Sequence, residues 1–189
     1  MGVEIEKKYR LTGAEWESLR ARLAEVGAEP RGAEAFEENT IYTGPGLDPH
    51  RRVLRLRRVG GRAVFTFKER EPTESAVKRQ REEETEVSDA DGLAAILDAL
   101  GYRPALVYEK RRTTWRVAGA EVVVDELPFG LFVEIEGEEE TILEAEALLG
   151  LAGAEAEHAP YPALTARHGT DRGGVVEARF PPAHGGEIV

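Results

Sequence analysis

Side chains of like charge, spaced two residues apart, recur along this chain. The acidic pairs are Glu4 with Glu6, Glu84 with Glu86, and Glu134 with Glu136. The basic pairs are Arg55 with Arg57, and Lys110 with Arg112. In a β-strand, residues two apart project from the same face, so each pair presents two like charges side by side. Basic side chains bind phosphate oxygens, and carboxylates beside them hold divalent cations. The pairs therefore predict a site for a phosphate-rich anion and a metal ion.

The residues that alternate with these charges are apolar. Val133 and Ile135 alternate with one acidic pair, and Leu54 and Leu56 alternate with a basic pair. We therefore expect strands with one face on a core and one charged face. An open antiparallel sheet with one face in water produces the same alternation. If the sheet closes instead, the charges line an interior, where each unpaired group costs several kcal/mol and a charged ligand removes that penalty.

Three amphipathic helices are expected, each after a Glu-x-Glu strand. Their expected limits are Thr12 to Gly27, Ser88 to Gly101, and about Glu138 to near Gly150. The first has the sequence of a capping box, in which Thr12 and Glu15 each bond the other's backbone N–H. Helices that follow strands, with apolar residues facing the sheet, predict an α+β fold in one domain of 189 residues.

The overall charge limits the partners. Twenty-five basic and thirty-six acidic side chains give a formal net charge of −11, which disfavours binding to bulk nucleic acid. Basic residues are nevertheless concentrated between Arg51 and Lys68, a segment without a single acidic residue. Solvated strand faces would also produce such a run, but a local anion pocket is the functional interpretation.

The composition also limits cofactors and location. The chain has no cysteine, and its four histidines lack metal-ligand spacing, so we expect any metal to be held by oxygen. No run of eighteen apolar residues is present, and the chain starts with a charged, strand-like segment. We therefore expect a cytoplasmic protein without a membrane association.

The ordered motifs resemble the CYTH proteins, or triphosphate tunnel metalloenzymes, over about residues 1 to 165. The N-terminal Glu4-x-Glu6-x-Lys8 is similar to the family's ExExK signature. The motifs that follow in order are Ile41-Tyr42 before Pro45, Leu54 to Arg57, Lys68, the Glu84 and Glu86 strand, Lys110-x-Arg112, Asp125, and Phe132 to Glu136. Gly101-Tyr102-x-Pro104 and Gly130-Leu131-Phe132 look most like the class IV adenylyl cyclase branch.

The resemblance implies a closed, antiparallel eight-stranded β-barrel with helices packed outside it. It implies roles for residues in four groups. The triphosphate is bound by Lys8, Arg55, Arg57, Lys68, Lys110 and Arg112. One or two Mg²⁺ or Mn²⁺ ions are held by Glu4, Glu6, Glu134 and Glu136. Further acidic wall is supplied by Glu84, Glu86 and Asp125, and the catalytic residues are Lys8, Glu6 and Arg57.

Several positions depart from the family pattern. Pro160 stands where a serine precedes Tyr161, and Thr43 stands where many members have an acidic residue. Glu82 stands where many members have an arginine before the Glu-x-Glu strand. Arg79 or Arg81 could supply that charge, but both point to the other face of the strand unless a bulge intervenes, so neither is placed in the site. The remaining basic residues expected to face outward are Arg51, Arg52, Arg58 and Arg111. We expect the CYTH domain to span residues 1–168 and residues 169–189, rich in Gly and Pro, to form a loose tail.

Three functions remain open from the sequence. The first is a class IV adenylyl cyclase that converts ATP to cyclic AMP and pyrophosphate, because the resemblance is closest to that branch. The alternative is hydrolysis of inorganic triphosphate, thiamine triphosphate or a nucleoside triphosphate. A non-catalytic nucleotide or polyphosphate sensor is the third, although a pure phosphate binder gains little from so many carboxylates. A homodimer is plausible from the resemblance alone.

Overall fold

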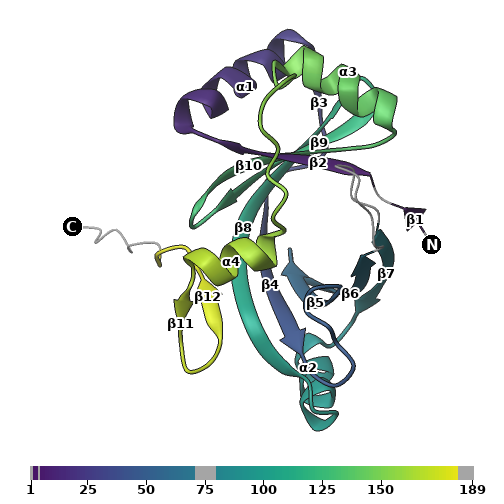
Figure 1. Ribbon diagram of the computed structural model, residues 1–189, viewed down its shortest axis with the longest axis vertical. Coiled ribbons are helices and arrows are strands. Elements are labelled where there is room, and N and C mark those ends of the chain that lie inside the picture. The colour runs from purple at the N-terminus through teal and green to yellow at the C-terminus, as the bar shows by residue number, and fades with distance from the viewer. Residues whose placement is uncertain (1, 4, 71–79, 183–189) are drawn as a thin grey trace.

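The computed structural model describes residues 2–3, 5–70 and 80–182, and these form one α+β domain around a single, mostly antiparallel sheet (Figure 1). The predicted ligand Glu4 lies outside the described residues. The first six strands are β1 Gly2–Val3, β2 Glu6–Leu11, β3 Glu29–Pro30, β4 Ala35–Thr43, β5 Arg52–Val59 and β6 Arg62–Arg70. The others are β7 Gln80–Val87, β8 Arg103–Val117, β9 Ala120–Leu127, β10 Gly130–Glu136, β11 Thr170–Asp171 and β12 Val176–Ala178. The α+β prediction is confirmed.

The order of the strands brings the predicted motifs into one sheet. Hydrogen-bonded neighbours follow the path β1-β7-β6-β5-β4-β8-β9-β10-β2. The path starts at β1 and ends at β2, which are successive segments of the N-terminus. Among the described residues the ladder between these ends is open, so the closed eight-stranded barrel stays a prediction. The path nevertheless places the basic strands β5 and β8 on either side of β4, and the acidic strand β10 beside β2.

The four helices are α1 Gly13–Glu25, α2 Ala90–Ala99, α3 Glu139–Leu149 and α4 Tyr161–His168. The capping box of α1 is confirmed, because Thr12 accepts from the Glu15 N–H and the Glu15 carboxylate accepts from the Thr12 N–H. Gly150 ends α3 in the left-handed region, at φ 72°, as its position predicted. The expected start of α2 at Ser88 is wrong by one residue, because the Asp89 carboxylate accepts from Gly92 N at 2.8 Å and caps the helix.

Helices α1 and α3 cover the same part of the sheet, over β2, β9 and β10 (Figure 1). The core beneath them contains Leu19 and Leu23 of α1, Ile142 of α3, and Val133 and Ile135 of β10. Burial of each such side chain stabilises the fold by about 1.5–3 kcal/mol. Because Val133 and Ile135 point into this core, the residues that alternate with them on β10 face the other side of the sheet.

Helix α4 and the hairpin after it were not predicted. Tyr161 and Leu164 of α4 pack with Tyr108 of β8 and Phe132 of β10 in a second core cluster. Strand β12 pairs in parallel with β8, and β11 pairs with β12. The expectation of a loose tail is therefore wrong for residues 170–178. Ala178, 5% exposed, joins the second cluster, so apolar burial anchors a segment whose glycines suggested a flexible chain.

The core face of β10 gives a direct test of how the acidic pair is positioned. Ile135 is fully buried between two glutamates, so Ile135→Ala should lower the free energy of unfolding by about 2–5 kcal/mol through lost burial and the cavity left behind. Leu143→Ala, at a residue of α3 that is 51% exposed, is the control and should change it by about 0.5 kcal/mol or less. Urea denaturation measures both, and equal losses would contradict the assigned core face.

Candidate functional site

A cavity of about 320 Å³ lies on the charged face of the sheet. Its lining contains the following predicted residues: Glu6, Lys8, Arg55, Arg57, Lys68, Glu84, Lys110, Arg112, Glu134 and Glu136. They come from β2, β5, β6, β7, β8 and β10. Residues far apart in the sequence therefore converge on one hollow, because the charged positions of each strand alternate with apolar positions that face the core.

Two of the predicted acidic residues that the structure describes are not in the lining. Glu86 is exposed and pairs with Arg62, also exposed, at 3.4 Å between Arg62 Nη1 and Glu86 Oε1. Asp125 is fully buried behind the lining and not part of its surface. Glu84 and Glu86 lie on the same face of β7, so the position of Glu86 reflects its place along the strand, beyond the cavity, and not the alternation.

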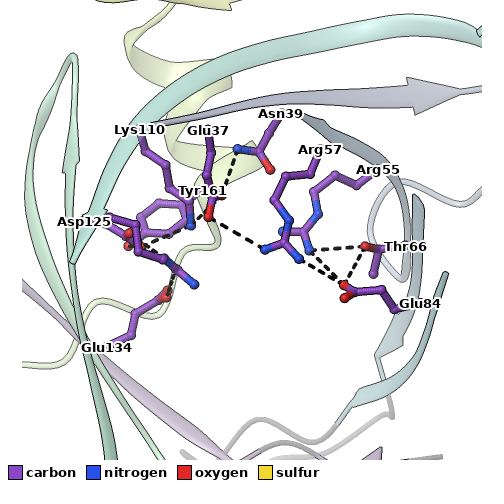
Figure 2. A network of polar contacts seen from close by, with 11 residues as sticks. Glu37, Asn39, Arg55, Arg57, Thr66, Glu84, Lys110, Asp125, Glu134 and Tyr161 are labelled. Carbon is purple, nitrogen blue, oxygen red and sulfur yellow. Dashed lines mark hydrogen bonds and ion pairs between the residues drawn. The ribbon is translucent and has the colours of Figure 1, made fainter. Parts of the chain in front are cut away.

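Asp125 forms the buried base of one half of the site (Figure 2). Its two carboxylate oxygens accept from Arg112 Nε at 2.7 Å and Arg112 Nη2 at 2.6 Å. The Oδ2 atom also accepts from Tyr161 OH at 2.9 Å and lies 3.4 Å from Lys110 Nζ. Burial alone would raise the pKa of Asp125, but Lys110 and Arg112 and the hydrogen bonds from Arg112 and Tyr161 hold that pKa well below its usual range. The carboxylate is therefore ionised and orients both cations.

Glu134 lies at the surface of this half of the site. Its Oε2 atom accepts from Arg112 Nη2 at 2.9 Å, and its Oε1 atom lies 3.9 Å from Lys8 Nζ. Burial, followed by the negative charges of Asp125 and Glu6, raises the pKa of Glu134, despite the opposing effect of Arg112 and Lys8. A further cation near these carboxylates would lower that pKa again.

The arginine pair of β5 forms the other half of the site (Figure 2). Arg57 Nη2 lies 3.2 Å from Glu84 Oε2, and Arg55 Nη2 lies 3.9 Å from the same oxygen. The Thr66 hydroxyl donates to Glu84 Oε2 at 3.1 Å and accepts from Arg55 Nη2 at 3.3 Å. The Nε atoms of Arg55 and Arg57 are buried, and within the described part of the chain neither has a hydrogen-bond partner. Each guanidinium has five N–H donors, and its contacts in the described chain use only part of that capacity.

Sequence reasoning missed some residues of the site. Arg51, expected to face outward, lines the cavity, and so does Glu82, which pairs with Lys68 at 2.6 Å. Tyr161 also lines the cavity, although Pro160 before it departs from the family pattern. Pro160 is the N-cap residue of α4, where it replaces the family serine without breaking the helix. The tyrosine itself was visible in the resemblance, whereas nothing in the run of arginines distinguished Arg51.

Glu37 of β4 is the other residue that was missed. It is 3% exposed and lies behind the lining, where its carboxylate contacts cations from both neighbouring strands. In the structure Glu37, Asn39 and Ile41 lie on one face of β4 and all three are buried, which the sequence alone did not indicate. Glu37 was overlooked because the acidic pair here is the adjacent Glu37 and Glu38, without the spacing of two residues.

A second cavity, of about 1100 Å³, lies apart from these charges. It is lined by parts of β2, α1, α4 and the segment that joins α3 to α4, and includes Arg22 and Arg167. It is larger than the first cavity, but its lining contains none of the residues predicted for the site. We therefore place the candidate site in the smaller cavity, where opposite charges converge.

Comparison with known proteins identifies the family. The CYTH domain model matches residues 2–155, most of the chain. The chain belongs to the CYTH family. A search of curated proteins finds no matching sequence.

Solved structures with a similar fold come from several organisms. A protein of Pyrococcus horikoshii has 25% sequence identity and a TM-score of 0.70, over 84% of this chain and 96% of its own. A candidate adenylate cyclase from Vibrio parahaemolyticus has 24% identity and a TM-score of 0.67, over 87% and 98%. A Hippeastrum protein, described as a candidate adenylyl cyclase with a dominant triphosphatase activity, has 18% identity and a TM-score of 0.63, over 84% and 91%.

CYTH proteins bind triphosphates and depend on a metal ion, and the carboxylates of this cavity fit such an ion in donor type and charge. Glu136 lies opposite Glu6 of β2 in one register and opposite Glu121 of β9 in the other. Like charges in opposed positions repel, and a divalent cation offsets that repulsion. Within residues 5–70 and 80–182, no three His, Cys, Asp or Glu side chains already converge on one ion position. The same part of the chain has no helix of the length and apolarity that a bilayer span requires.

The buried ion pairs of Asp125 predict a pH-dependent stability. The pKa of Asp125 in the fold lies below the value of about 3.9 expected in the unfolded chain. Its stabilisation is therefore complete above about pH 5 and is lost as the pH falls towards the folded-state pKa.

Asp125→Asn should lower the free energy of unfolding at pH 7 by about 3 kcal/mol, because two buried cations lose their partner. The difference from the wild type should narrow below about pH 4. Urea denaturation at several pH values measures it, with Glu126→Gln, at a half-exposed neighbour that pairs with Arg111, as the control. A difference of the same size at pH 3 and pH 7 would show that the charge of Asp125 is not what stabilises the site.

Proposed function

We propose that this CYTH protein is a metal-dependent enzyme that processes a nucleoside triphosphate, with conversion of ATP to cyclic AMP and pyrophosphate as its reaction. The observation that carries the proposal is the convergence of six predicted cations and four predicted carboxylates on one cavity of about 320 Å³. Several guanidinium and ammonium groups together match the charge of a triphosphate, for which bidentate arginine contacts are well suited.

The division of the lining supports separate roles for its residues. We assign Arg55, Arg57, Lys68, Lys110 and Arg112 to the phosphate oxygens. We propose Lys8, Glu6 and Arg57 as the catalytic residues, with Lys8 stabilising negative charge near the reacting phosphorus. When bound, Mg²⁺ or Mn²⁺ held by Glu6, Glu134 and Glu136, with Glu4 as a further ligand, supplies charge neutralisation at the phosphate oxygens. We further propose that the N-terminal strands complete the sheet into the closed tunnel of the family.

The chemistry is an in-line displacement at phosphorus. In the cyclase reaction the ribose 3′-oxygen forms a bond to the α-phosphorus, the bond to the pyrophosphate oxygen breaks, and the hydroxyl proton is released. Part of the cavity lining is apolar or aromatic: Ile41, Val53, Tyr108, Pro160 and Pro162. This wall suits the organic part of a nucleotide, and it favours an organic triphosphate over the inorganic one.

Hydrolysis is the second candidate. The Hippeastrum protein with the same fold is described by a dominant triphosphatase activity. The same phosphate and metal contacts serve hydrolysis when water attacks in place of the ribose hydroxyl, so the contacts alone favour neither reaction.

Product analysis separates the candidates. The purified protein is incubated with ATP and, separately, with tripolyphosphate, in Mg²⁺ or Mn²⁺ and in EDTA. We expect cyclic AMP and pyrophosphate from ATP, with turnover lost in EDTA. Orthophosphate from tripolyphosphate would select the hydrolase, and saturable binding without turnover would select the sensor. Neither binding nor turnover of any triphosphate would refute the proposal as a whole.

Adjacent arginines of β5 provide a matched test of the phosphate contacts. Arg57 lines the cavity, whereas Arg58 pairs with Asp91 and Glu38 outside it. Arg57→Ala should raise the dissociation constant for tripolyphosphate about ten-fold or more, because a charged hydrogen bond contributes about 1.5–3 kcal/mol. Arg58→Ala, which removes the same charge from the other face, should change it far less. Titration calorimetry measures both, and equal effects would mean that only net charge matters.

A further inference from the structure

Glu37 is a buried carboxylate placed between two cations of the cavity. Its strand, β4, lies between β5 and β8 in the sheet. The Oε2 atom of Glu37 is 3.3 Å from Lys110 Nζ on β8, and the Oε1 atom is 3.9 Å from Arg57 Nη1 on β5. Glu37 and Lys110 are also direct partners in the β4–β8 register. One carboxylate therefore contacts a cation on each neighbouring strand.

The surroundings keep this carboxylate charged and oriented. Burial alone would raise the pKa of Glu37, but Lys110, Arg112 and Arg57 together hold that pKa below its usual range. Asn39 lies two residues along β4, opposite Arg57 in the register, and its amide nitrogen donates to Glu37 Oε2 at 3.4 Å. Asn39 is fully buried, so its side chain has little freedom to release the contact.

Glu37 joins the two halves of the site. Figure 2 shows Arg57, Arg55 and Glu84 on one side, Lys110 and the Asp125 cluster on the other, and Glu37 between them. Lys110 and Arg57 carry the same charge and repel each other unless an anion lies between them. A carboxylate in that place stabilises both cations before any ligand binds.

The negative charge of Glu37 distinguishes a positioning role from a purely electrostatic one. A negative charge close behind an anion site weakens the attraction of every anion to that site. Glu37 therefore opposes phosphate binding if only its charge is considered. Its effect on binding is favourable only if it holds the cations in an arrangement that a triphosphate needs, which lowers the cost of ordering them.

We propose that Glu37 is a positioning residue that fixes the spacing of Arg57 and Lys110 and thereby makes the cavity prefer a triphosphate over a shorter phosphate. The proposal rests on the proposed function, since it concerns the substrate class of the same site. A three-phosphate chain reaches both cations when their separation is fixed. A shorter anion depends less on that separation, because it can be bound by one half of the site.

The test is the ratio of two affinities in Glu37→Gln. Titration calorimetry gives the dissociation constants of tripolyphosphate and of pyrophosphate for the same preparation. Positioning predicts that tripolyphosphate binds about ten-fold more weakly and that pyrophosphate changes less, so the preference for the longer anion falls. A pure charge effect has the opposite sign, because removal of a negative charge should make both anions bind more tightly.

Glu38→Gln is the matched control. Glu38 is the next residue of β4, on its other face, where it pairs with Arg179 at 2.6 Å and with Arg58 at 3.7 Å. The substitution removes the same charge from the same strand and should leave the ratio of affinities unchanged. A melting curve for each variant separates a loss of stability from a change of preference, since partial unfolding lowers the affinity for both anions by the same factor.

Glu37→Asp is the second variant, which tests the proposal if Glu37→Gln does not fold. The shorter side chain keeps the charge but cannot reach both cations, so the ratio should lie between those of the wild type and Glu37→Gln. A wild-type ratio in either folded variant overturns the proposal, as does tighter tripolyphosphate binding in Glu37→Gln. Failure of the wild type to bind tripolyphosphate is a different result, which overturns the proposed function and this inference with it.

Discussion

The fully buried carboxylate of Asp125 is the constraint on which the site depends. It binds Arg112 with two hydrogen bonds, lies beside Lys110, and accepts from Tyr161. A buried charge of this kind is tolerated only when paired and hydrogen-bonded, so strands β8 and β9 and helix α4 must meet here. Tyr161 in turn contributes its ring to the core cluster that anchors α4. Tyr161 therefore links the apolar packing of α4 to the carboxylate that orients the cations.

The two faces of the sheet lie in different environments, one apolar and one charged. On one face, β10 buries Ile135 under α1 and α3, and on the other it presents Glu134 to the cavity. The cations and carboxylates there are partly paired with each other, which limits the cost of burial without a ligand. The buried Nε atom of Arg57 has no hydrogen-bond partner in the described chain. We propose that a bound triphosphate completes this network.

The strands with strict alternation could be predicted from the sequence, because a spacing of two residues places side chains on the same face. This holds for Arg55 and Arg57 and for Lys110 and Arg112, which all line the cavity. What sequence reasoning missed depends on tertiary contact. Glu37 acquires its place only when β4 lies between two basic strands. The phase of alternation also does not say where a strand leaves the cavity, as the exposed position of β7's second glutamate shows. The Pro-rich and Gly-rich sequence around helix α4 and its hairpin did not predict these elements. Core contacts and pairing with β8 hold them in place.

The central claim is that the smaller, charged cavity is where a triphosphate binds. A crystal structure of the protein with tripolyphosphate tests it most directly. We expect phosphate density between the β5 arginines and Arg112, with Lys110 and Lys8 in contact with its oxygens. Density in the larger cavity beside Arg22 and Arg167, or none in the smaller cavity at saturating tripolyphosphate, would contradict it.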